Sequence, residues 1–311
     1  MTTVADGLFQ FGGMPVGSSL LTNKIFSTPT KGTAYFVDTA YGGNGNGRSP
    51  KTAFSTMARA FASVQSGDII YFVGKVTEQL VTPVQVFDVT VVGCGNRPRH
   101  ADATPDGGNH AASQWGAPAS GGVAAQATVR VLQQGWRFVN ILFTMIDANA
   151  AGIELVRNAA AGDDERDASH AHIIGCKFVG AGVGIRSGVA GTFTELVNHV
   201  VVEGNVFIDN THAMRDAIGT SRWSIRHNEF QANTNHIVMK LGASFIYENI
   251  FGAFTTDAVE LPGGAGSNII TKNYLSGTYS SAGGYTVSNA NDEWAGNFNT
   301  LAGGITVADP A

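Results

Sequence analysis

One pattern recurs four times in the second half of the chain and constrains its fold more than any other feature. A β-rich run is followed by Asn, one variable residue and a large apolar residue, in VVVEGNVF (200–207), WSIRHNEF (223–230), SFIYENIF (244–251) and NIITKNYL (268–275). The asparagines are Asn205, Asn228, Asn249 and Asn273, spaced by 23, 21 and 24 residues. Such a period is the sequence signature of a solenoid, in which each repeat stacks on the one before it.

Short strands without helical spacing inside the repeat predict an all-β fold, a parallel β-helix. Stacked coils place equivalent residues in columns about 4.8 Å apart. We therefore expect Phe207, Phe230 and Phe251 to form an internal stack. The asparagines should lie at a bend in left-handed conformation and hydrogen-bond the next coil. Both columns are predicted to be structural and not binding sites.

Residues 34–75, AYFVDTAYGGNGNGRSPKTAFSTMARAFASVQSGDIIYFVGK, resemble the first segment of right-handed parallel β-helix proteins of the pectate-lyase-like superfamily. The resemblance implies a right-handed solenoid with a short capping helix at its N-terminal end. The domain organisation expected from it is an N-terminal arm over 1–31, a strand, Gly-rich turn and capping helix over 32–68, and the β-helix over 69–311. Lateral loop insertions are expected at about 97–127 and 157–170.

The Gly-rich turn GGNGNGRSPKTAF (42–54) separates a strand from a helix, an order that also occurs in phosphate-binding loops. Its glycines read GxGxG instead of GxGxxG, and the last of them, Gly47, is followed by Arg48-Ser49-Pro50 and not directly by the Lys-Ser or Lys-Thr pair of a Walker A loop. We predict that the turn leads the chain onto the capping helix and binds no ligand. Ser55 is expected to cap that helix, with Met57, Phe61 and Val64 on its buried face.

Composition excludes several partners and compartments. The net charge is −5, only 14% of residues are charged, and no basic cluster suggests nucleic-acid binding. No basic residue precedes Lys24 and no run of 18 apolar residues occurs, which predicts a chain made in the cytoplasm without a signal peptide or membrane span. Cys94 and Cys176 lie among apolar residues and are expected to be buried. No cofactor or metal is predicted.

A more specific resemblance lies in GCGNRPRHADATPDGGNHAASQWGAP followed by LQQGWRFVNILF. These strings are similar to short β-helix proteins encoded by tailed phages, commonly among virion structural genes. The resemblance implies a virion surface protein that assembles as a homotrimer and contacts other virion proteins of the capsid or tail.

The sequence offers one arrangement for acid/base chemistry. If Ile218, Val238 and Val259 stack inward, a second column holds Asp216, His236 and Asp257, where carboxylates flank a histidine. Residues two apart on a strand share a face, so this column should point inward unless a turn intervenes, and polar residues in turns or at strand ends are the preferred explanation.

Other polar groups are predicted to lie on the surface or in a loop. The columns just before the asparagines, such as Glu203 and Arg226, mix charge signs and indicate a hydrogen-bonded exterior. The pair His170 and His172 is expected at a solvated strand edge. The 101–127 insertion is expected either to pack against the coil or to carry recognition through His110 and Trp115.

Three functions remain open at this level. The first is a noncatalytic structural protein of a phage virion, either a capsid decoration (cement) protein or a short spike. The second is a tailspike polysaccharide depolymerase acting on host surface glycans, with Asp216, His236 and Asp257 as its catalytic residues. The third is a noncatalytic glycan-binding module for receptor recognition.

Overall fold

The structure, a computed structural model, describes residues 9–11, 14–16, 32–41, 43, 45–95, 113–116, 126–158, 166–180, 182–188, 196–216, 219–263, 266–275, 285–286, 291–301 and 304–307. These residues are almost entirely β, apart from the 3-10 turn η2 (Pro50–Thr52) and the helix α2 (Met57–Phe61). Among them, no helix has the length and apolar character needed to cross a membrane.

Three long sheets run along the molecule, and each coil between the two ends contributes one strand to each sheet. Sheet 1 contains β3 (Ala34–Asp38), β4 (Ile69–Val73), β7 (Thr90–Gly93), β10 (Arg137–Val139), β15 (His172–Ile174), β19 (Val201–Glu203), β23 (Ser224–Arg226), β27 (Phe245–Tyr247), β30 (Ile269–Thr271) and β33 (Glu293–Ala295). Sheet 2 contains β5 (Lys75–Val76), β8 (Gln114–Gly116), β11 (Leu142–Met145), β16 (Lys177–Gly180), β20 (Val206–Ile208), β24 (Glu229–Gln231), β28 (Ile250–Phe251), β31 (Tyr274–Leu275), β34 (Phe298–Leu301) and β35 (Gly304–Val307). Sheet 3 contains β6 (Leu80–Val81), β9 (Ala127–Val131), β12 (Ala151–Leu155), β17 (Val183–Ser187), β21 (His212–Asp216), β25 (Asn233–Val238), β29 (Phe254–Glu260) and β32 (Tyr285–Thr286).

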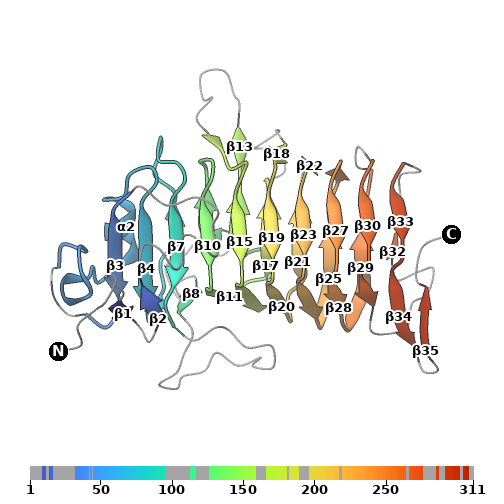
Figure 1. The fold of residues 1–311 in the computed structure, drawn as a ribbon, viewed down its shortest axis with the longest axis horizontal. Coiled ribbons are helices and arrows are strands. Elements are labelled where there is room, and N and C mark those ends of the chain that lie inside the picture. The colour runs from blue at the N-terminus through green and yellow to red at the C-terminus, as the bar shows by residue number, and fades with distance from the viewer. Residues whose placement is uncertain are drawn as a thin grey trace.

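The long sheets are parallel throughout, except that β35 returns antiparallel to β34. A short fourth sheet joins β18 (Val197–Asn198), β22 (Thr220–Ser221) and β26 (Leu241–Gly242). Two antiparallel hairpins complete the strands, β1 (Phe9–Phe11) with β2 (Met14–Val16) and β13 (Arg157–Asn158) with β14 (Arg166–Asp167). Figure 1 shows the strands of sheet 1 side by side along the long axis of the molecule, from β3 to β33. The expected right-handed parallel β-helix is confirmed.

The predicted phenylalanine stack fills the interior behind sheet 2. Phe178, Phe207, Phe230 and Phe251 are fully buried, and successive ring centroids are 4.9, 4.9 and 5.0 Å apart in stacked geometry. The stack continues backward to Phe143 at 5.0 Å. Each stacked aromatic pair contributes about 0.5–1.5 kcal/mol beyond the burial of its area.

The asparagine column is also confirmed, at the bend between sheets 1 and 2. Asn228 Oδ1 accepts hydrogen bonds from both the backbone N–H and Nδ2 of Asn205, at 2.9 and 3.0 Å. The same geometry joins Asn228 to Asn249, Asn249 to Asn273 and Asn273 to Asn297. The ladder satisfies polar groups that the tight bend would otherwise leave buried without partners.

The expectation that these asparagines adopt the left-handed conformation was wrong. That conformation falls one residue earlier, at His227, Glu248 and Lys272, whose φ angles lie between 53° and 55°. The bend is therefore made by the preceding exposed residue, and this leaves the Asn side chain pointing inward to bond its neighbours.

A second bend uses the same device. Asn268 Oδ1 accepts from the backbone N–H of Ser244, and Asp292 Oδ1 accepts from both the N–H and Nδ2 of Asn268. An aspartate such as Asp292 can be the last residue of this column, because the last side chain accepts hydrogen bonds from the coil before it and does not need to donate to another side chain.

Helix α2 covers the N-terminal end of the solenoid, as predicted, and buries Met57 and Phe61. Its N-cap is Thr56, whose Oγ1 accepts from Arg59 N, so the prediction of Ser55 was wrong by one residue. The carboxylate of Glu78 accepts from the N–H groups of Met57 and Ala58 at 2.9 and 2.8 Å. A carboxylate at a helix N-terminus is stabilising, and this one ties the cap to the first coil.

The Gly-rich turn contacts strand β3 and lies before helix α2 in the chain. Gly47 has φ 71°, accepts a hydrogen bond from Phe36 N, and donates to Thr52 O at 2.6 Å. A Cβ on Gly45 would overlap the backbone carbonyl of Thr52. The turn requires glycine for close backbone contact, consistent with the predicted structural role.

The predicted 97–127 insertion is interrupted by a coil strand, β8, which pairs with β5 and β11. Trp115 on this strand is fully buried, stacks on Phe143, and donates from Nε1 to Glu78 O at 2.9 Å. The hypothesis of Trp115 as a recognition residue was therefore wrong, because its ring belongs to the core. His110 lies outside the described residues.

Both cysteines are buried and free, as expected. Burial raises the pKa of the Cys176 thiol to about 12, so the reactive thiolate is scarce at neutral pH.

Candidate functional site

The outer face of sheet 3 carries a column of charged side chains on four successive coils. Register pairs Arg130 on β9 with Glu154 on β12, Glu154 with Arg186 on β17, and Arg186 with Arg215 on β21. We call these four residues the arginine column. The column holds three guanidinium groups and one carboxylate, which leaves it positively charged.

Glu154 is the centre of this column, and its side chain is completely buried. One of its oxygens accepts from Nε of Arg130, and the other accepts from Nε of Arg186 at 2.9 Å and pairs with Nη2 at 2.7 Å. Arg186 also donates from Nη1 to the carbonyl of Asn149 at 2.9 Å. Charge-assisted hydrogen bonds of this kind fix side-chain geometry, so the guanidinium groups are held in place.

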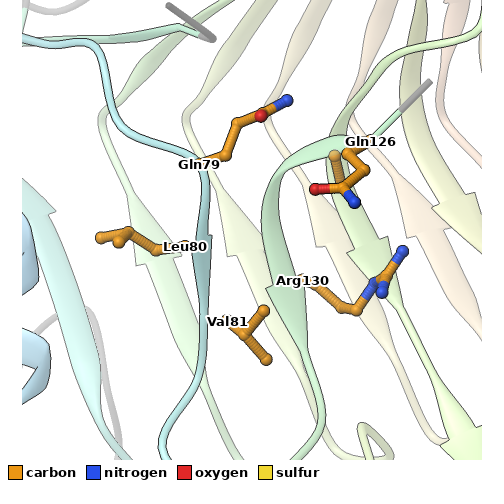
Figure 2. Close-up of a pocket in the computed structure, with 6 residues that line it drawn as sticks. Gln79, Leu80, Val81, Gln126 and Arg130 are labelled. Carbon is orange, nitrogen blue, oxygen red and sulfur yellow. The ribbon is translucent and has the colours of Figure 1, made fainter. Parts of the chain in front are cut away.

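A shallow pocket lies at the N-terminal end of the column, between β6 and β9. It is lined by Gln79, Leu80, Val81, Gln126, Ala127 and Arg130. Figure 2 shows Gln79, Leu80 and Val81 on one segment and Gln126 and Arg130 on the neighbouring one. Two amide side chains and a guanidinium group beside an apolar wall form a surface suited to a small polar group.

The C-terminal end of the same sheet is acidic. Asp216 is nearly buried, and burial raises its pKa to about 6, although the Lys240 N–H, which donates to its Oδ2 at 2.7 Å, opposes the shift. Burial and the neighbouring Asp257 raise the pKa of Glu260. A carboxyl group with a pKa near 6 can both donate and accept protons close to neutral pH.

The expected column of Asp216, His236 and Asp257 does not exist. Register pairs Asn235 with both His212 and Asp257, and Ile237 with both Met214 and Val259. His236 therefore lies on a different column from either aspartate. Of the supposed inward residues, Val259 is confirmed, Val238 aligns with Arg215 on the outer face, and Ile218 lies outside the described residues.

His236 is an internal residue. It is fully buried against the rings of Phe230 and Phe251. Its Nδ1 accepts from Asn233 Nδ2 at 3.0 Å, and its Nε2 donates to Gly252 O at 3.3 Å. Burial lowers its pKa to about 4, so the imidazole is neutral at pH 7 and has no access to a substrate.

The histidine that shares a column with one of these aspartates, Asp257, is His212, which was not among the residues predicted from the sequence. Its Nε2 lies 3.4 Å from Asn235 Nδ2, and its column continues to Asp257. Burial, aided by Arg215, lowers its pKa to about 4. The spacing of the apolar residues Met214, Ile237 and Val259, 23 and 22, was a signal that pointed to this register.

The mixed-charge columns before the asparagines form a bonded exterior, as predicted. Arg226 donates to Glu203 at 2.8 Å and to the Tyr247 hydroxyl at 2.7 Å. On the neighbouring column, His227 Nε2 lies 2.7 Å from Glu248 Oε2. These groups satisfy one another across successive coils.

Solved structures with the same fold share little sequence with this chain. Escherichia coli YbhC matches with a TM-score of 0.52 and 12% identity, over 87% of this chain and 79% of YbhC. An alginate lyase from Paenibacillus sp. str. FPU-7 gives 0.43 and 14%, over 78% and 92%. The Dettilon tailspike protein gives 0.31 and 11%, over 85% and 61%. No protein-family model and no curated protein matches the sequence. At these identities the likeness shows the β-helix fold alone.

Proposed function

We propose that this protein is a noncatalytic, carbohydrate-interacting β-helix of a phage virion surface, and that the arginine column is its contact for acidic glycans. The observation that carries the proposal is the locked arrangement of Arg130, Glu154 and Arg186, continued by the exposed Arg215. Arg186 and Arg215 lie one coil apart, at a strand spacing of about 4.8 Å, and Arg130 lies two coils before Arg186 with Glu154 between them. The one-coil spacing is close to the length of one sugar unit, so an extended polyuronate can place successive carboxylates on Arg186 and Arg215.

The ion pairing of Glu154 supports the noncatalytic part of the proposal. Its two oxygens are occupied by two guanidinium groups, and it is completely buried. A carboxylate held in this way is out of contact with a ligand, so it orients the arginines. The guanidinium groups of Arg130 and Arg186 are thereby fixed as positive charges on this face, so binding an acidic ligand costs little side-chain entropy.

The binding experiment uses polygalacturonate as an acidic polymer and dextran as a neutral one, measured by calorimetry at low and high salt. We expect binding of polygalacturonate alone, weakened by salt because the contact is electrostatic. Arg215→Ala should weaken it about tenfold, the effect of losing one charged hydrogen bond. Lys51→Ala, which removes an exposed positive charge elsewhere, is the matched control. Equal affinity for both polymers, or equal loss in the two variants, contradicts the assignment.

A polysaccharide depolymerase is the second candidate, and the raised pKa of Asp216 is the observation that favours it. Incubation with host surface polysaccharide, followed by reducing-end and unsaturated-sugar assays, distinguishes the two. Product formation that disappears in Asp216→Asn would replace the noncatalytic proposal by the catalytic one.

The virion location and the homotrimer rest on the resemblance of the 93–118 and 132–143 strings to short phage β-helix proteins. Quantitative mass spectrometry of purified virions measures the copy number, and light scattering measures the mass of the assembly in solution. Many copies per virion would support a capsid decoration protein, whereas a few would support a tail spike. Absence of the protein from purified virions would contradict the virion location, and the mass of a monomer in solution would contradict the homotrimer.

A further inference from the structure

Two histidines stack on the exterior, at the bend that precedes sheet 1. His170 comes just before β15 and His199 just before β19, on successive coils, and both side chains are exposed. Their ring centroids are 4.8 Å apart and their planes differ by 4°. Both residues have left-handed backbones, with φ of 61° and 57°, and each N–H donates to a carbonyl of the next coil. The backbone therefore fixes the two rings as neighbours.

The separation of the rings matches that of two imidazoles on one metal ion. A metal–nitrogen bond of about 2.0–2.1 Å places each ring centroid about 3.2 Å from the metal. At ligand angles between square-planar and tetrahedral values, roughly 90° and 109°, two such centroids lie about 4.5–5.2 Å apart. The observed distance falls inside this interval. Only a rotation of the exposed rings about χ2 is needed, so that both planes converge on the ion.

The surroundings keep the imidazoles available as ligands. Nearby Asp167 is engaged, since its oxygens accept from Ser169 N and Gln134 Nε2. Within the described part of the chain, no cluster of three or more metal-ligating side chains occurs, so water would fill the remaining positions.

We propose that His170 and His199 form a site for a divalent transition metal of the Ni²⁺, Cu²⁺ or Zn²⁺ class. The ion bridges two successive coils. Two protein ligands supply about half of the binding free energy of a four-ligand zinc site, so the expected Kd is on the order of 10–100 µM. Because the unfolded chain does not hold the two imidazoles together, binding also stabilises the folded coils.

The test is calorimetric titration of the untagged protein with NiCl₂ after treatment with EDTA and buffer exchange. We expect one Ni²⁺ per chain at this site, and at least a tenfold weaker Kd in His170→Asn and in His199→Asn. Asn tolerates the left-handed backbone at both positions. Thermal unfolding provides a second measurement: Ni²⁺ should raise the midpoint of the wild type and leave that of the double variant unchanged.

His227→Asn is the matched control, since His227 is also exposed and left-handed, with φ 53°, but stands on another bend. It should retain the Ni²⁺ affinity of the wild type. Circular dichroism in EDTA establishes that each variant is folded. The proposal is overturned if the wild type does not bind at 1 mM NiCl₂, if the folded double variant binds equally well, or if the control loses the site.

Discussion

Replacing Asn228 by Ala tests whether the asparagine ladder stabilises the solenoid. The Asn228 side chain makes four buried hydrogen bonds: two accepted from Asn205, and two donated, to Val202 O at 2.9 Å and to Asn249 Oδ1 at 3.0 Å. Alanine leaves the N–H and Nδ2 of Asn205 and the carbonyl of Val202 each without one partner. Each orphaned buried group costs about 1–3 kcal/mol, so we expect a loss of about 4 kcal/mol of unfolding free energy after partial relaxation.

Urea unfolding, followed by tryptophan fluorescence, measures this loss as the change in midpoint multiplied by the m value. The control is Ser224→Ala on the same coil, whose hydroxyl has no hydrogen bond among the described residues and whose removal should cost less than about 0.5 kcal/mol. A loss below about 1 kcal/mol for Asn228→Ala would refute the reasoning, because water or backbone movement would then replace the ladder.

Three further predictions follow from the core, a buried histidine and the Gly-rich turn. Phe207→Ala, which opens a cavity between two stacked rings, should lower the unfolding free energy by about 3–5 kcal/mol in the same urea assay. His236 has a folded pKa of about 4, below the value of about 6.5 in the unfolded chain. Its contribution is therefore present above pH 6.5 and is lost as the pH falls toward 4. His236→Phe should lose less stability than the wild type between pH 7 and 4.5, by up to roughly 3 kcal/mol, and equal losses would contradict the shift. Gly45→Ala should lower the thermal midpoint by several degrees more than Gly43→Ala, because a Cβ at 45 meets the backbone of Thr52 whereas one at 43 meets a side chain; equal midpoints would speak against a tightly packed turn.

The features that the sequence predicted correctly are those that depend on the coil period alone. Parallel coils stack at a constant distance, so a residue type repeated at the period must form a column. Phe207, Phe230, Asn205 and Asn228 could be assigned in this way without knowledge of any turn. The capping helix was predictable because its signal is local, although the N-cap was misplaced by one residue.

The candidate site was not predictable, because it depends on the turns between sheets 2 and 3. These turns contain three residues after Ile208, one after Gln231 and two after Phe251, and a register shift follows Asn233. A turn that differs in length by one residue, or a register shift of one residue, exchanges the inward and outward positions of the strand that follows. For this reason the sequence grouped His236 with the two aspartates, whereas the register places His212 in the column of Asp257.

The sequence by itself determined the period, the parallel coils, the phenylalanine and asparagine columns and the covered N-terminal end, because each follows from short-range patterns repeated at one spacing. Only the tertiary structure decided which charged groups meet. Glu154 lies 24 residues from Arg130 and 32 from Arg186, and His170 lies 29 from His199. These separations differ because the chain inserts loops of unequal length between coils, and only the stacking of backbones brings the side chains into contact.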